Sequence, residues 1–249
     1  RALFMGGGGP VHTEIQYSIF SSGGGANDFG DLQIERQPWN ARANDSVRGF
    51  VMGGSSPTSN PTRIGSIEVI TMASTGDANI FGDLTKKSRR GGGCSSPTRA
   101  IHFTGRDDPA RTKDIQFFTM ATQGDAAKFG ELTADERDSH AGCFSSNIRG
   151  VVGGGVPSTA VNTIEYITIA TQGNSQDFGD LTVARYAGGG TSSKVRGIFT
   201  GGYQYPSTVV SKDIIDYVTI ATTGDAIDFG DLTANTRNHD ATSDVNGGL

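Results

Sequence analysis

Short apolar runs that alternate with polar residues recur along the whole chain. In one stretch, residues 163–169 (Thr-Ile-Glu-Tyr-Ile-Thr-Ile) alternate with a period of two, as a half-buried strand does. A run at 149–152 precedes this stretch, and a glycine turn at 172–174 and a second run at 178–182 follow it. A Gly/Ser-rich run at 187–193 comes next. Four short strands per repeat are predicted, and no segment has the i, i+3, i+4, i+7 spacing of a helix.

The alternating run belongs to a module that reads I-x-Y-x6-G-x4-F-G-[D/E]-L and occurs five times without insertion or deletion. Val69 and Phe117 replace its tyrosine in the second and third copies. The phenylalanines recur at intervals of 52, 48, 49 and 51 residues. A period near 50 that is built from strands predicts a β-propeller with one blade per repeat. The five copies span residues 15–32, 67–84, 115–132, 164–181 and 215–232.

An arginine opens the second strand of every repeat, and the chain begins on that strand. It ends with residues 240–245, which resemble the Gly/Ser-rich inner strand. We therefore predict an all-β, five-bladed propeller of four-stranded antiparallel blades, in which the C-terminal strand completes the first blade and closes the ring. The alternative is an open array of repeats that continues beyond these residues. The arginines are Arg1, Arg48, Arg99, Arg149 and Arg196.

The whole chain, residues 1–249, is predicted to be a single propeller domain, and we interpret it as a fragment of a longer protein. The repeats are expected at 1–36, 37–88, 89–137, 138–185 and 186–237, with 238–249 closing the first blade.

Composition narrows the function classes. The chain has 37 glycines and only 35% apolar residues, which suits many thin sheets. A net charge of −5 without a basic stripe argues against nucleic-acid binding. No run of 18 apolar residues occurs, so membrane insertion is not predicted either.

Side chains that could do chemistry are not arranged as a catalytic or metal site requires. The four histidines lack ligand spacing, and Gly-x-Ser-x-Gly is absent. The glycine runs lack the Gly-Lys-Ser/Thr sequence and the helix of a phosphate loop. Cys94 and Cys143 are interpreted as two buried free thiols. We therefore predict no catalytic residues, metal or cofactor, and a protein that is not an enzyme.

Two repeated polar features have a structural and a functional interpretation. The acidic turns, such as Asp225, Asp228 and Asp231, could bind calcium, but the copies vary, and Asp serves turns by bonding its own backbone. The repeated arginine could form an anion-binding ring. We favour an arginine that pairs between blades or donates hydrogen bonds to strand ends.

The order Leu181-Thr182, Arg185, Gly-Gly-Gly, Gly201-Gly202 and then residues 215–217 resembles a kelch repeat, with Phe in place of the second aromatic, Trp. The amino-acid sequence of residues 217–233 (Tyr-Val-Thr-Ile-Ala-Thr-Thr-Gly-Asp-Ala-Ile-Asp-Phe-Gly-Asp-Leu-Thr) is similar to repeats in structural and tail-fibre-like proteins of marine cyanophages. That resemblance covers all five repeats. It implies a virion component and, after release, an extracellular location.

Length variation is confined to two kinds of loop. Labelled a to d from the axis outward, the c–d module is constant, whereas the Arg-to-Ile distance across the b–c loop is 14, 19, 16, 15 and 19 residues. Because strands in a blade are antiparallel, the b–c and d–a loops should open on one face of the disc. Aromatic and polar side chains on these loops suit recognition of a saccharide or protein. The candidate ligand-binding residues are Trp39, Asn40, Asn60, Arg106, Asp108, Tyr186, Tyr203 and Tyr205.

These observations predict a domain of a virion surface appendage that binds a host cell-surface glycan or protein through the variable face. Other virion subunits are expected partners, with a homo-oligomeric arrangement in the particle. The alternative is an architectural disc that joins or decorates virion subunits and binds no ligand of its own.

Overall fold

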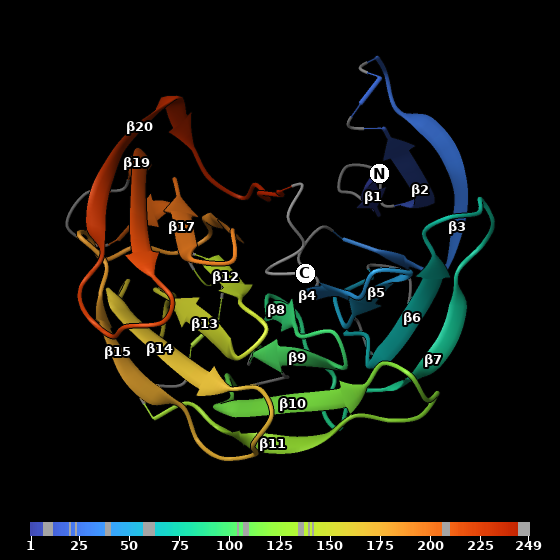
Figure 1. Ribbon diagram of the computed structural model, residues 1–249, viewed down its shortest axis with the longest axis horizontal. Coiled ribbons are helices and arrows are strands. Elements are labelled where there is room, and N and C mark those ends of the chain that lie inside the picture. The colour runs from blue at the N-terminus through green and yellow to red at the C-terminus, as the bar shows by residue number, and fades with distance from the viewer. Residues whose placement is uncertain are drawn as a thin grey trace.

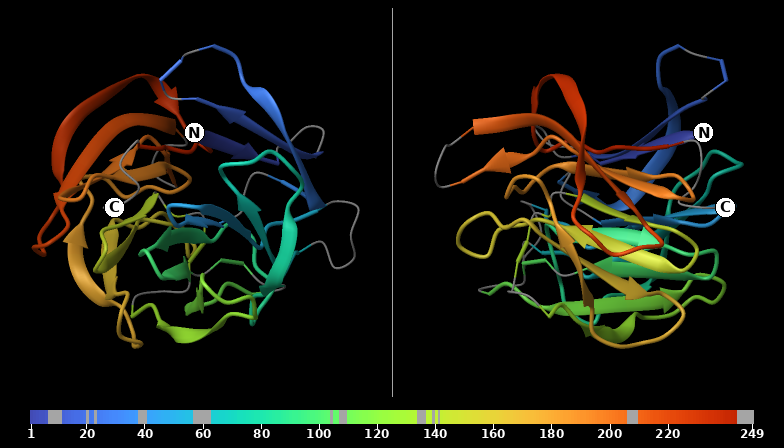
Figure 2. Two further views of the ribbon diagram at one scale, coloured as in Figure 1. Left: turned by 45° about the vertical axis from the view of Figure 1, so that its right-hand side comes forward. Right: turned by 60° about the vertical axis from the view of Figure 1, so that its left-hand side comes forward.

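The computed structural model shows five small antiparallel sheets around one axis, which confirms the predicted all-β, five-bladed propeller (Figure 1). It describes residues 1–6, 12–19, 21–22, 24–37, 41–56, 63–103, 105–106, 110–133, 137–138, 140, 142–205 and 210–243. Across these ranges the regular elements are strands, and none is a helix. The sheets follow one another round the axis in chain order, which two further views also show (Figure 2).

Each sheet is one blade. Blade 1 contains β1 (Ala2–Met5), β2 (His12–Ser18) and β3 (Asn27–Arg36). Blade 2 contains β4 (Ala41–Asn44), β5 (Arg48–Met52), β6 (Ser66–Thr71) and β7 (Asn79–Asp83). Blade 3 contains β8 (Gly92–Ser95), β9 (Arg99–Phe103), β10 (Asp114–Thr119) and β11 (Ala127–Glu131).

Blade 4 contains β12 (Gly142–Ser145), β13 (Arg149–Gly153), β14 (Thr163–Thr168) and β15 (Gln176–Asp180). Blade 5 contains β16 (Gly189–Ser192), β17 (Arg196–Thr200), β19 (Val210–Thr219) and β20 (Ile227–Thr236), and the short β18 (Tyr203–Gln204) pairs with the start of β19. In blades 3 to 5 the Gly/Ser-rich strand is innermost, as predicted, and in blade 2 the innermost strand is β4.

The hydrophobic core lies between blades rather than inside one. We call the side of a blade that carries the repeat Phe its forward face, and the opposite side its rear face. On the forward face of blade 4, Phe178 packs with Val218, Ile220 and Ala226 on the rear face of blade 5. Equivalent clusters join blades 1 and 2, 2 and 3, and 3 and 4. Because the module has the same spacing in every copy, these neighbouring blades form the same kind of interface.

Two further contacts complete each interface. The glycine after the repeat Phe lies against the turn of the next blade: a Cβ added at Gly130 would lie 2.0 Å from the Gly173 carbonyl oxygen. The turn Asp or Asn accepts a hydrogen bond from a backbone amide of the preceding blade, as in Asp180 N to Asp225 Oδ1 (3.0 Å). Asp77, Asp125 and Asn174 do the same. The prediction that the acids bond their own backbone is therefore wrong for Asp225 and its equivalents, which connect neighbouring blades, but holds for Asp228, whose Oδ1 accepts a hydrogen bond from Gly230 N (3.0 Å).

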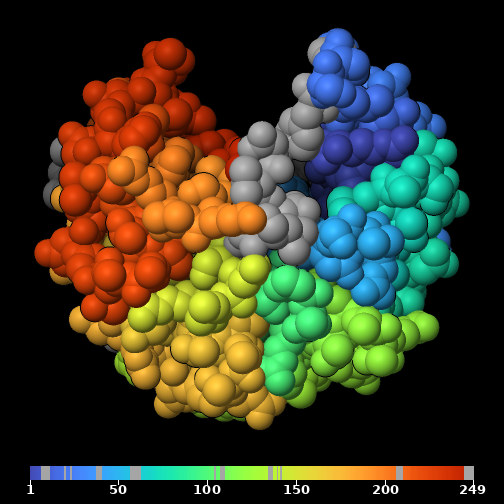
Figure 3. All heavy atoms as spheres, in the orientation of Figure 1, coloured from blue at the N-terminus to red at the C-terminus, as the bar shows by residue number. Residues whose placement is uncertain are grey.

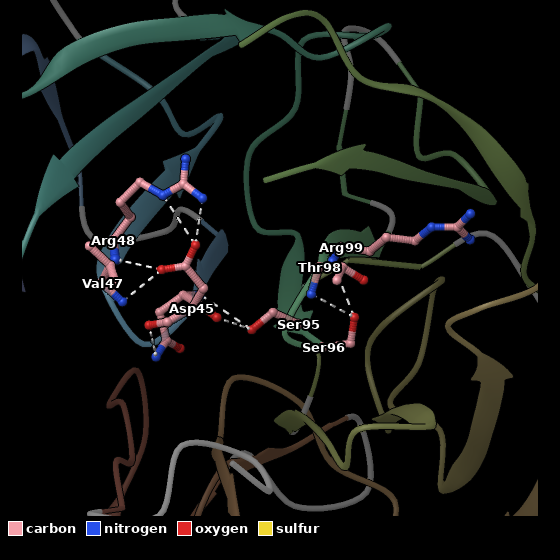
Figure 4. Close-up of polar contacts among 8 residues, drawn as sticks. Asp45, Val47, Arg48, Ser95, Ser96, Thr98 and Arg99 are labelled. Carbon is pink, nitrogen blue, oxygen red and sulfur yellow. Dashed lines mark hydrogen bonds and ion pairs between the residues drawn. The ribbon is translucent and has the colours of Figure 1, made fainter. Parts of the chain in front are cut away.

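The repeated arginines act mainly as predicted, as donors to strand ends. Arg99 Nη1 donates to the Ile169 carbonyl of blade 4 (2.9 Å), and its guanidinium lies 5.0 Å from the Phe117 ring centroid. Arg48 differs because blade 2 has Val69 in place of the aromatic residue. Its guanidinium bonds Asp45 instead, and Figure 4 shows it turned toward Asp45 while Arg99 extends away.

A chain of hydroxyl groups links the inner strands. Ser95 Oγ donates to the Asn44 carbonyl (2.7 Å), a contact visible in Figure 4. Ser145 donates to Ser95, Ser192 donates to Ser145, and Ser243 donates to Ser192, at 2.6, 2.8 and 2.9 Å. Small side chains are needed here because all the inner strands crowd around one axis.

The described residues show only part of the predicted closing strand. Within them blade 1 has three strands, and residues 237–243 form none, although Ser243 and Asp240 lie beside the inner strands of blades 5 and 2 through Ser192 and Arg42. Residues 244–249, the end of the predicted closing segment, lie outside the described residues. At the rim an open notch separates blade 5 from blade 1 (Figure 3). Pairing of a C-terminal strand with β1 therefore stays a prediction.

Candidate functional site

The two variable kinds of loop meet on one face of the disc, as the antiparallel order of the strands requires. Each described d–a loop pairs through its backbone with the b–c loop of the following blade: Arg89 with Arg106, Asp138 with Val156, and Tyr186 with Tyr203. Gln37 N also donates to the Ser55 carbonyl at 2.8 Å. One backbone arrangement thus carries different side chains at successive blades. We call this surface the loop face.

Three of the predicted residues gather on the loop face of blade 5. The rings of Tyr186 and Tyr203 are 5.4 Å apart and nearly perpendicular, at 83°. The guanidinium of Arg237 lies 4.4 Å from the Tyr203 ring centroid, within cation–π range. The side chain of Tyr205 is 44% exposed, and its carbonyl accepts a hydrogen bond from the Ala160 amide (3.0 Å). We call Tyr186, Tyr203, Tyr205 and Arg237 the tyrosine cluster.

The remaining predicted residues do not join this cluster. Arg106 pairs with Arg89 at blade 3. Trp39, Asn40, Asn60 and Asp108 lie outside the described residues. The structure therefore brings together three of the eight candidates.

A cavity of about 280 Å³ opens beside the tyrosine cluster, at the axis. Its wall combines the glycine backbone of the inner strands and Arg42 of β4 with residues of the d–a connections and the C-terminal segment, among them Arg90, His140, His239 and Asp240. We call it the axial pocket. Tyr186 is next to it in the chain, because Ala187 lines the wall, and Arg237 precedes Asn238, which also lines it.

Three wall residues have the left-handed backbone conformation that is uncommon outside glycine: Arg90, Ala187 and Asn238, with φ of 60°, 55° and 54°. In each case the residue lies at the end of a d–a connection, where the chain turns toward the axis. Such conformations persist only where surrounding structure holds them, and they concentrate at functional sites.

Burial controls the ionisation of the groups at the axis. It lowers the pKa of His140 to about 3, with help from the positive charge of Arg137, and burial lowers the pKa of His102 to about 4. The pKa of His239 is lowered by burial too. Burial raises the pKa of Tyr186, assisted by the neighbouring Tyr203. At neutral pH the positive charge of the pocket wall therefore belongs to its arginines.

Sequence reasoning missed Arg237, Arg90, His239 and the pocket itself. Arg237 has a recognisable signal, because it lies five residues after the repeat Leu, where Arg137 also lies. The Arg137 side chain is buried and forms an ion pair with Glu165. The equivalent Arg237 is exposed, and its guanidinium contacts the Tyr203 ring.

Potential metal ligands and thiols also occur elsewhere in the described residues. No three His, Cys, Asp or Glu side chains within them gather as a metal site would need. Cys94 and Cys143 are free, as predicted, with Cys94 buried and Cys143 only partly so. Burial raises the pKa of Cys94 to about 12 and that of Cys143 well above its ordinary value, which keeps both thiols protonated. No helix in the described part of the chain could cross a membrane.

Comparison with protein-family models and with curated proteins gives no match for this chain.

Proposed function

We propose that this propeller is a binding domain of a virion surface appendage and that its loop face recognises a host cell-surface glycan or protein. The tyrosine cluster is the observation that carries this proposal. Its exposed ring and its Arg-backed aromatic pair form the type of surface that binds sugar rings and protein side chains.

The two loops that carry Tyr186 and Tyr203 support each other. Tyr186 and Tyr203 exchange two backbone hydrogen bonds, of 3.0 and 2.7 Å, so the two loops hold each other in place. Binding to such a preformed surface avoids most of the entropy cost of ordering loops. The resemblance of the repeats to cyanophage structural and tail-fibre-like proteins supports a virion location, where many copies of a weak site would add avidity.

Direct binding tests this function. Labelled 249-residue protein would be titrated onto intact cyanobacterial cells and onto their extracted surface polysaccharide, beside a Tyr203→Ala/Tyr205→Ala variant. Tyr217→Ala is the matched control, because Tyr217 lies under Arg196, away from the loop face. We expect saturable binding that the double variant loses and the control keeps. Binding that survives in the double variant, or no binding by a multimerised domain, would contradict the proposal.

A second function, an architectural disc that joins virion subunits, is favoured by a different observation. Large apolar side chains are exposed on the outermost strands: Ile80 on β7 and Ile227 on β20, with exposed fractions of 44% and 57%. Apolar groups at the rim suit contacts with other virion subunits or further copies of this chain. Sedimentation velocity separates the two functions, because an Ile80→Lys/Ile227→Lys variant would lose self-association but keep glycan binding.

A further inference from the structure

We infer that the axial pocket binds the anionic group of an acidic saccharide, while the tyrosine cluster holds the adjoining part of the same glycan. This inference rests on the proposed function and names the ligand class of its site. It goes beyond the loop residues that the sequence indicated, because the inner strands β4, β8, β12 and β16 contribute to the pocket wall.

The charge of the pocket wall favours an anionic ligand. The chain carries a net charge of −5, yet the axial pocket is lined by Arg42 and Arg90 and by one acid, Asp240. Asp240 forms an ion pair with Arg42, and the carboxylate side chain is 70% exposed whereas that of Arg42 is 30% exposed. A partly buried arginine held by a solvent-exposed carboxylate can exchange that partner for a carboxylate or sulfate of a ligand.

Two residues of the pocket wall have atoms with unused hydrogen-bonding capacity. Among the described residues, Arg42 Nε and His239 Nδ1 have no hydrogen-bond partner although both atoms are buried. His239 Nε2 lies 2.9 Å from Thr200 Oγ1, which donates its own proton to the Gly189 carbonyl (3.3 Å). This geometry assigns the proton to Nε2 and makes Nδ1 an acceptor, which suits a sugar hydroxyl. Arg42 and His239 both line the axial pocket, so these two atoms can bond polar groups of a ligand that enters it.

The position and size of the pocket also suit such a ligand. Arg90 and Ala187 line the same pocket, and Ala187 follows Tyr186 in the chain, so the charged wall borders the tyrosine cluster. A volume of about 280 Å³ is just below the range of sites that enclose drug-sized ligands. It fits one saccharide unit, whose neighbour would then extend over the exposed Tyr205.

The test compares one polymer in two charge states. Polygalacturonic acid and its carboxyl-reduced, neutral form would be titrated with the 249-residue protein at two salt concentrations. The variants are Arg90→Gln and Arg42→Gln, with Arg196→Gln as the matched control because Arg196 is an exposed arginine stacked on Tyr217. Thermal unfolding of each variant establishes that it is folded.

We expect the acidic polymer to bind at least tenfold more tightly than the neutral one, with affinity that falls as salt rises. Arg90→Gln should weaken acidic binding about tenfold, the typical cost of losing a charged hydrogen bond, and Arg196→Gln should leave it unchanged. Equal binding of the two polymers, no binding of the acidic polymer, or full binding by the folded Arg90→Gln variant would overturn the inference. If cells bind through Tyr203 but the acidic preference is absent, the proposed function holds and this inference fails.

Discussion

Blade 5 has two sides that carry nearly the same sequence module and have different surroundings. On the side shared with blade 4, Phe178 is 2% exposed and packs into the cluster with Val218, Ile220 and Ala226. On the side that faces the notch, the equivalent Phe229 is 56% exposed. A Cβ added at Gly179 would lie 2.5 Å from the Gly224 backbone, whereas nothing lies within 4 Å of one at Gly230.

This difference shows that the module forms only half of an interface. The other half is the rear face of the next blade, which offers an apolar residue at the position of Ile70, Phe118, Ile167 and Val218, and an oxygen acceptor at the position of Asp77, Asp125, Asn174 and Asp225. Blade 1 has Ser18 and Gly25 at these two positions. Its rear face therefore lacks two of the groups that hold the other blades together.

The largest effect is expected from the two phenylalanines. Phe178→Ala should lower the free energy of unfolding by about 3–5 kcal/mol, because it leaves a cavity in a packed core. Phe229→Ala should lower it by less than about 1 kcal/mol, because more than half of that residue is already exposed to water. Urea unfolding of both variants measures the contrast. Equal losses would mean that blade 5 packs against blade 1 in solution.

The arginine five residues after the repeat Leu, Arg137 or Arg237, provides the next comparison. Arg137→Met should cost about 3 kcal/mol, because it leaves the buried carboxylate of Glu165 without its ion pair, although Thr133 and Ser175 still donate to that carboxylate. Arg237→Met removes an exposed side chain and should cost less than about 0.5 kcal/mol. The same urea titration applies, and a large loss at Arg237 would show an acidic partner that meets it across the notch.

A glycine pair isolates the steric part of the interface. Gly179 and Gly230 have similar positive φ, 142° and 136°, so the backbone strain of an alanine is the same at both. Only Gly179→Ala also forces a Cβ against the Gly224 backbone. We expect it to be less stable than Gly230→Ala by about 1–3 kcal/mol. Thermal melts of the two variants measure the difference, and similar melting temperatures would contradict close packing of blades 4 and 5.

Low pH should destabilise the protein more through His140 than through His239. The pKa of His140 is about 3 in the folded protein, below its ordinary 6.5, so the unfolded chain takes up a proton first as pH falls. The contribution of His140 to stability is complete above pH 6.5 and is lost by about 1.4 kcal/mol per pH unit below it. His140→Gln should flatten this loss between pH 6.5 and 5, and His239→Gln, at the half-buried C-terminal site, should flatten it less. An unchanged slope in His140→Gln would exclude this histidine as the cause.

Local pattern was enough to predict the strands, the blades and the face on which the variable loops meet. Alternation of apolar and polar residues, as in 163–169, determines a half-buried strand, and a constant 18-residue module repeats one interface because each blade must bury the same surface. Tyr186, Tyr203 and Tyr205 were found for a similar reason: they are aromatic residues in loops of variable length.

Contacts between blades were decided only by the tertiary structure. Asp225 bonds an amide that is 45 residues away, and Arg237 lies beside Tyr203 rather than an acid, because neighbouring blades bring together groups that no local spacing relates. The axial pocket arises in the same way, from inner strands that converge on one axis. The identity of the strands and the forward face of each blade follow from local sequence, since both depend on neighbours along the chain. Packing between blades decided the site and the open notch, since both depend on surfaces contributed by separate repeats.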